Sequence, residues 1–151
     1  MGVLMSRFAV LLGLLLVSSN IAAAGLTGLW VGYYSYGGNA RVPMSVVIQS
    51  DGPTLIGQMI EPQTSGEALD IGRPAIIFGE SDGNRVVFDK AYFSDLKSIT
   101  PIRLKEGAQP VEYKLVLSQQ GQVMSGQWFI GEAFGEASFK RVTPETVDRL
   151  R

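Results

Sequence analysis

The sequence predicts an all-β protein, an eight-stranded antiparallel up-and-down β-barrel followed by a short C-terminal helix. In several short segments apolar and polar residues alternate, which is the period of a half-buried strand rather than of a helix. Short turns rich in glycine, aspartate, asparagine and glutamine separate these segments, as in β-hairpins. Closing such a meander into a barrel removes the exposed edges that an open sheet would have to protect.

The strands follow from this alternation in order along the chain. The pattern is clearest over 41–50 and 111–118, where every second residue is apolar, and it is less regular over 85–92. The eight expected strands lie at 28–36, 41–50, 54–61, 75–81, 85–92, 111–118, 122–130 and 132–140. We expect the first strand to pair with the eighth, which would place Trp30 and Phe139 in the same interior.

Two longer connections interrupt the hairpin spacing, at 62–74 and 93–110. Both are rich in glycine, proline, serine and charged residues, so we expect surface loops outside the regular sheet. Thr143 and Pro144 are typical of a helix start, and a short terminal helix is expected over 144–150. The expected organisation is a cleaved leader, a barrel domain and a tail or short helix, at 1–24, 25–143 and 144–151.

The first 24 residues have the order of a secretory signal peptide. Arg7 precedes an apolar run over 8–17, and an Ala-x-Ala cleavage site occupies 22–24. The apolar run is shorter than the about 20 residues that a transmembrane helix needs. Polar and charged residues on the outward faces of the strands argue against a lipid-facing barrel. We therefore expect an exported protein without a membrane span, periplasmic or extracellular, with a retained membrane anchor as the alternative.

The composition argues against several function classes. The chain has no histidine and no cysteine, so the commonest general base, the commonest metal ligands and the thiol nucleophile are missing. One of its 13 basic side chains is Arg7 in the leader, which leaves 12 against 14 acidic ones and no basic field for nucleic acid. We expect no enzyme activity, no catalytic residue, no metal, no cofactor and no nucleic-acid partner.

Three segments carry a family resemblance. They read A-G-L-T-G-L-W at 24–30, S-G-Q-W at 125–128 and A-S-F-K-R-V-T-P at 137–144. Together they resemble the avidin and streptavidin family, and the Gly-x-Trp start is more loosely similar to lipocalins, which share the eight-stranded meander. The resemblance implies the same barrel fold.

The resemblance also bears on the ligand. In avidin-like proteins, side chains that form hydrogen bonds and several tryptophans hold biotin, and Trp128 is similar to one of those tryptophans. Met59 stands where the family has a hydrogen-bonding tyrosine, and 85–92 lacks the family's tryptophan. The family's aspartate near the last strand falls at about Ala137. Most of the polar contacts to biotin are therefore missing, and we expect no sub-micromolar binding of biotin.

The inward face of the expected barrel is rich in aromatic residues. An eight-stranded barrel is either filled by its own side chains or holds one small ligand, and both arrangements remain open. Candidate ligand contacts are inward side chains that are large and apolar, several of them with a polar tip: Trp128, Tyr113, Tyr34, Tyr92, Phe88 and Met59. We expect a binding protein for a small apolar or amphiphilic molecule. The alternative is an envelope-associated or secreted protein-interaction or inhibitor module, which an interior cavity of about 300 Å³ or more would argue against.

Lys90 is a charged residue on the strand at 85–92. If it shares the inward face with Phe88, it needs a partner such as Glu61, because a buried unpaired charge is costly. We expect instead a solvated position for Lys90 near the barrel end.

Overall fold

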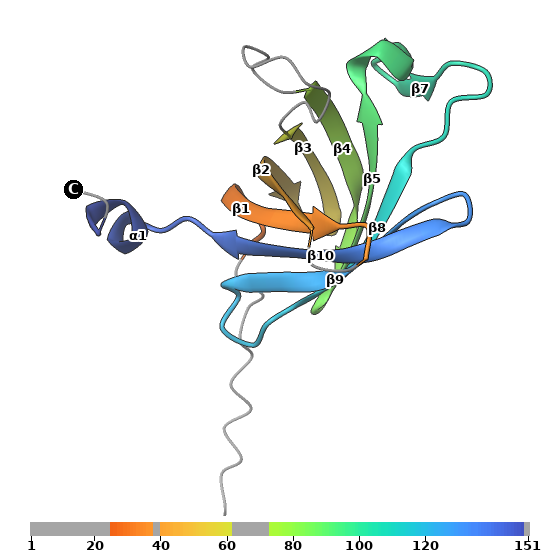
Figure 1. Cartoon of the computed structure of the whole chain (residues 1–151). Coiled ribbons are helices and arrows are strands. Elements are labelled where there is room, and N and C mark those ends of the chain that lie inside the picture. The colour runs from red at the N-terminus through yellow and green to blue at the C-terminus, as the bar shows by residue number, and fades with distance from the viewer. Residues whose placement is uncertain (1–24, 38–39, 62–72, 150–151) are drawn as a thin grey trace, which may run out of the picture.

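The computed structural model describes residues 25–37, 40–61 and 73–149. Eight strands close into one barrel in the order β1-β10-β9-β8-β5-β4-β3-β2, and every neighbouring pair is antiparallel (Figure 1). The expected all-β class and the eight-stranded closed barrel are confirmed. The expected leader at 1–24 lies outside the described residues.

The barrel strands lie within two residues of their expected bounds. They are β1 (Gly28–Ser35), β2 (Arg41–Asp51), β3 (Thr54–Glu61), β4 (Arg73–Asp82), β5 (Arg85–Tyr92), β8 (Val111–Leu117), β9 (Val123–Ile130) and β10 (Ala133–Arg141). β1 pairs with β10, with Gly32 opposite Phe139. Trp30 and Phe139 are both buried in one core cluster, as expected from the closure of the barrel.

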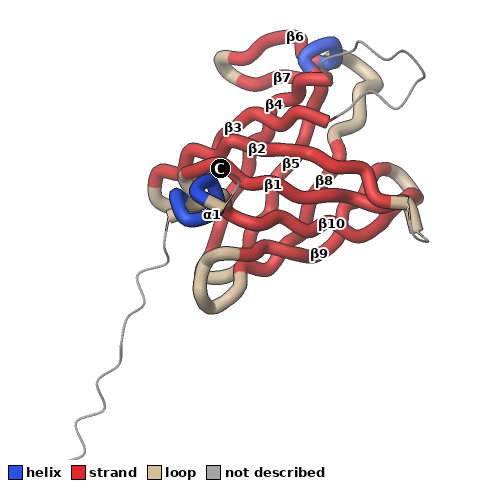
Figure 2. Tube along the Cα trace, turned by 60° about the vertical axis from the view of Figure 1, so that its left-hand side comes forward, coloured by secondary structure: helices blue, strands red, loops and turns tan. Residues whose placement is uncertain are grey.

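The connection between β5 and β8 lies outside the barrel sheet but is more than a loop. It contains the short 3-10 helix η1 (Phe93–Asp95) and a two-stranded sheet of β6 (Leu96–Ile99) with β7 (Ile102–Leu104). Figures 1 and 2 show this hairpin beside the ends of β4 and β5. Of the other long connection, 62–72 lies outside the described residues. At the C-terminus, the expected helix over 144–150 is not confirmed, because the chain forms only a single turn there, α1 (Pro144–Asp148).

The barrel interior is filled by close packing. The ring of Phe88 stacks on that of Tyr113 with centroids 4.9 Å apart, and both side chains are about 1% exposed. Glycine allows neighbouring backbones to approach closely, since a Cβ on Gly126 would lie 2.1 Å from the carbonyl oxygen of Lys114. A glycine at such a position in a strand is therefore structural.

The two ends of the barrel differ in their side chains. At one end, here called the Trp30 end, the indole N–H of Trp30 donates to the carbonyl of Leu26 at 2.9 Å, and the Arg141 guanidinium lies 4.3 Å from the centre of the Trp30 ring. At the other end, the Trp128 end, the indole N–H of Trp128 donates to the carbonyl of Ser35 at 2.9 Å. The C-terminal ends of β1, β3, β5 and β9 lie at this second end. Within the described residues, no helix is long and apolar enough to cross a membrane.

Candidate functional site

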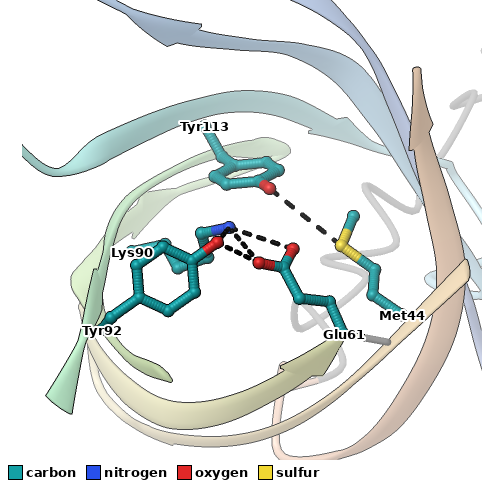
Figure 3. Close-up of polar contacts among 5 residues, drawn as sticks. All are labelled: Met44, Glu61, Lys90, Tyr92 and Tyr113. Atoms are coloured by element: carbon teal, nitrogen blue, oxygen red, sulfur yellow. Dashed lines mark hydrogen bonds and ion pairs between the residues drawn. The ribbon is translucent and has the colours of Figure 1, made fainter. Parts of the chain in front are cut away.

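A buried ion pair lies inside the barrel. The ammonium of Lys90 on β5 lies 3.2 and 3.3 Å from the two carboxylate oxygens of Glu61 on β3, and both residues are 4% exposed. The hydroxyl of Tyr92 donates to the same carboxylate, and the Lys90 ammonium lies 3.2 Å from that hydroxyl (Figure 3). On the intervening β4, Ala75 lies opposite Tyr92.

This pair both confirms and corrects the expectation for Lys90. The pairing with Glu61 is confirmed, whereas the solvated position is wrong. Alternation on β5 turns Lys90 inward with Phe88, and the carboxylate from β3 compensates its charge within the low-dielectric interior. A buried charge is tolerated because its partner is buried beside it.

Two further tyrosines lie near the ion pair. The hydroxyl of Tyr113 lies 4.0 Å from the sulfur of Met44, and Figure 3 shows both side chains pointing into the same interior as Glu61. Burial, followed by the nearby Glu61 charge, raises the pKa of Tyr113 well above its usual value. The pKa of Tyr34 is also raised, first by burial and then by its hydrogen bond to Tyr36.

An aromatic group lies next to the ion pair at the Trp128 end. The rings of Tyr34, Tyr36 and Trp128 meet edge to face, with centroids 5.0 to 6.1 Å apart. The Lys90 ammonium lies 5.8 Å from the centre of the Tyr34 ring, so Tyr34 connects the aromatic group to the ion pair. Tyr36 is 68% exposed and forms the outer side of the group.

A hollow of about 580 Å³, here called the rim hollow, opens beside this aromatic group. It lies between the end of β1 and the β9–β10 turn. The residues that line it include Tyr36, Gln127, Glu132, Phe134 and Glu136. No cationic side chain lines it within the described part of the chain. The hollow therefore combines two exposed aromatic rings with two negative charges.

Five of the six expected site residues, all but Tyr92, belong to the packed core, and Tyr92 packs against it. Met59, Phe88 and Tyr113 are at most 1% exposed. Tyr34, Tyr92 and Trp128 lie toward the Trp128 end. None of the six lines the rim hollow, although Tyr34 and Trp128 both contact Tyr36.

Several residues of this region were not found from the sequence. Tyr36 continues the alternation of Tyr34 and could have been found from it. Phe134, Glu132 and Glu136 carry no signal of their own, because only the pairing of β10 with β1 brings them beside the end of β1.

Function is inferred from the geometry of this site, because comparison with known proteins found no relative. No family model, curated protein or solved structure matches the chain. The eight-stranded barrel is established by its own strand order and register. Among the described residues, no three potential metal ligands converge. What the Trp128 end can do is therefore inferred from its side chains: it offers aromatic faces, carboxylates and neutral phenols, which suit non-covalent recognition.

Proposed function

We propose that the protein is an exported small-molecule-binding barrel, and that its ligand is an amphiphilic organic cation held in the rim hollow. The observation that carries this proposal is the volume of about 580 Å³ bounded by Tyr36, Phe134, Glu132 and Glu136. Ligand pockets of roughly 300–1,000 Å³ are typical for small molecules. The packed interior leads us to put the ligand at the rim and not at Met59, Phe88 or Tyr113.

The chemistry of the walls supports a cation. Tyr36 and Phe134 are 68% and 61% exposed, so each side chain keeps surface for a bound group, although the Phe134 ring also stacks with Phe129. An ammonium over such a ring is stabilised by about 0.5–2 kcal/mol. The Glu132 and Glu136 carboxylates add charge attraction, while the rings cover the apolar body of the ligand. An anionic ligand would meet two negative charges, and among the described residues that line the hollow none is a compensating cation.

Export and family relationship are part of the same proposal. The order of charge, apolar run and cleavage site over 1–24 supports export to the periplasm or the extracellular space. The residues at 24–30, 125–128 and 137–144 support a distant relationship to avidin-like or lipocalin-like barrels. Biotin is not the expected ligand, because Met59 offers no hydrogen bond where the family has a tyrosine.

Titration of the mature chain tests the proposal. The probes are alkyltrimethylammonium ions, the neutral alkanols of matching chain length, and biotin. In a Trp30→Phe variant Trp128 is the only tryptophan, so its emission should change on binding because it packs against Tyr36. We expect saturable binding of the cations, with at least roughly tenfold weaker binding of the neutral alkanols and of biotin.

Variants locate the site. Glu136→Gln and Tyr36→Ala should each weaken binding of the cation by roughly tenfold. Glu80→Gln changes an exposed carboxylate near the other end of the barrel and should leave binding unchanged. Equal binding of cations and neutral alkanols, or an equal effect of Glu136→Gln and Glu80→Gln, would refute the rim site. Failure of every probe to bind would favour the protein-interaction module instead.

A further inference from the structure

The rim hollow begins where the pairing of β1 with β10 ends. The last paired residues of these two strands are Tyr34 and Ala137, so Ser35 and Tyr36 continue beyond the β1–β10 ladder. Ser35 and Tyr36 both line the hollow, together with Gly135 of β10. The hollow is therefore a gap between the two strands past their last pair, and pairing with β10 does not fix the place of Tyr36.

The indole of Trp128 bridges this gap. Trp128 lies on β9 opposite Gly135 of β10, and its N–H donates to the carbonyl of Ser35 at 2.9 Å. Ser35 is 5% exposed, so the loss of a donor to its carbonyl costs free energy. This hydrogen bond connects the end of β1 to the β9–β10 hairpin just past the end of the ladder.

Gly135 allows the indole to reach Ser35. A Cβ on Gly135 would lie 1.8 Å from the carbonyl oxygen of Ser35 and 2.7 Å from the indole nitrogen of Trp128. Any other residue at position 135 would therefore displace both atoms of the hydrogen bond. A glycine in a strand often marks such a close approach, and here the close approach lies in the wall of the hollow.

Two aromatic rings hold Tyr36 beside this hydrogen bond. The ring centres of Trp128 and Tyr34 lie 5.0 and 5.4 Å from that of Tyr36, and both contacts are edge to face, which is a favourable arrangement. Tyr36 is 68% exposed, so the contacts leave much of its surface for a ligand. Trp128 is itself 3% exposed and does not line the hollow. Any effect of Trp128 on a ligand in the hollow must therefore pass through its neighbours.

We infer that Trp128 is a positioning residue of the rim hollow, which sets the affinity for an organic cation through Tyr36 without touching the ligand. The indole N–H fixes the Ser35 carbonyl, and the indole ring contacts Tyr36, the next residue along the chain. A side chain that is held in place before binding loses less conformational entropy when the ligand binds. This role rests on the proposed function of the hollow. Loss of the N–H should weaken binding of the cation only while the Tyr36 ring is present.

Replacing Trp128 with benzothienylalanine tests this role, because that residue keeps the shape of tryptophan and has sulfur in place of the N–H. Calorimetry with an alkyltrimethylammonium ion should show at least roughly fivefold weaker binding. The same replacement at Trp30 is the matched control. The Trp30 N–H donates to the carbonyl of Leu26, also at 2.9 Å, at the opposite end of the barrel. The control should leave the affinity unchanged, and equal effects at the two positions would overturn the inference.

A double-mutant cycle separates positioning from direct contact. In the Tyr36→Ala variant, the replacement at Trp128 should change the affinity by less than about twofold, because the ring through which Trp128 acts is missing. If the losses from Tyr36→Ala and from the replacement add instead, Trp128 contacts the ligand directly and the inference fails. Circular dichroism should show the same β-sheet signal for every protein compared.

Nuclear magnetic resonance without ligand gives an independent readout. In the parent chain, the Trp128 indole N–H should exchange slowly with solvent, and rapid exchange would overturn the inference without any variant. Ring signals of labelled tyrosine, assigned to Tyr36 with Tyr36→Phe, should move toward those of an unstructured tyrosine after replacement at Trp128 but not at Trp30. Signals that stay in place would also overturn it. If no cation binds the parent chain while the Tyr36 signals move, the proposed ligand fails and the positioning of Tyr36 by Trp128 is supported.

Discussion

Replacing Lys90 with methionine should destabilise the barrel strongly, because it leaves the Glu61 carboxylate buried without its cation. The ammonium lies 3.2 Å from the carboxylate, and both side chains are at most 5% exposed. At that separation two unit charges interact by about 5 kcal/mol with an effective dielectric constant of about 20. The remaining donor from Tyr92 offsets part of the loss. We expect the free energy of unfolding to fall by about 3–5 kcal/mol at pH 7.

The double variant Glu61→Leu/Lys90→Met separates the desolvation cost of burying the two charges from the attraction between them. It removes both charges and keeps similar side-chain volumes, so neither group has to be desolvated. Its stability should lie within about 1 kcal/mol of the parent chain or above it. If the double variant is instead about 1–2 kcal/mol less stable than the parent chain, the loss would correspond to the Tyr92 hydroxyl, which no longer has the Glu61 carboxylate as its hydrogen-bond acceptor.

Urea denaturation at pH 7, followed by far-ultraviolet circular dichroism, measures these differences. Lys114→Met is the matched control, because Lys114 forms a 3.0 Å ion pair with Glu112 while its side chain is 51% exposed. Such an exposed pair contributes at most about 1 kcal/mol. If Lys90→Met costs no more than Lys114→Met, the interior pair is not buried as described. If the double variant is as unstable as Lys90→Met, the ion pair itself stabilises the barrel and the reasoning from desolvation fails.

Two further predictions concern stability. Trp30→Ala should lower the free energy of unfolding by about 3–5 kcal/mol, because a fully buried indole is removed; a loss below about 1 kcal/mol in denaturant melts would show that Trp30 is not core. Burial first, and then the charge of Glu112 opposite it, raises the pKa of Asp89. The folded state therefore loses stability as the pH rises through that pKa. Asp89→Asn should be more stable than the parent chain at pH 7, by less than about 1 kcal/mol, and this advantage should vanish near pH 3, below the unfolded pKa of about 3.9. Melts of both proteins across this pH range check the sign, and an advantage that grows toward acid pH would contradict it.

The strands could be predicted because their signal is local. Alternation has a period of two residues, and each tight turn is marked by its own glycine or polar residue. The pairing of β1 with β10 follows from closure, so Trp30 and Phe139 could be assigned to one interior. The β6–β7 hairpin was missed because its strands of four and three residues are too short for alternation to be distinguished from a loop.

The candidate site could be predicted only in part. Aromatic character and alternation identified Tyr34, Tyr92 and Trp128, which do lie toward one end of the barrel. They could not show that Phe88 and Tyr113, which have the same character, are more deeply buried, at 1% exposed compared with 8% for Tyr34. Depth along the barrel axis depends on strand register and tilt, and neither is a property of a single strand.

The sequence by itself determined which residues face the interior, because side-chain direction in a strand depends only on the alternation of the chain. Only the tertiary structure decided that Lys90 is buried, since the Glu61 carboxylate that permits it comes from β3, across an intervening strand. The rim hollow has the same origin, because the end of β1 and the β9–β10 hairpin that line it are far apart in the chain and meet only where the barrel closes between β1 and β10.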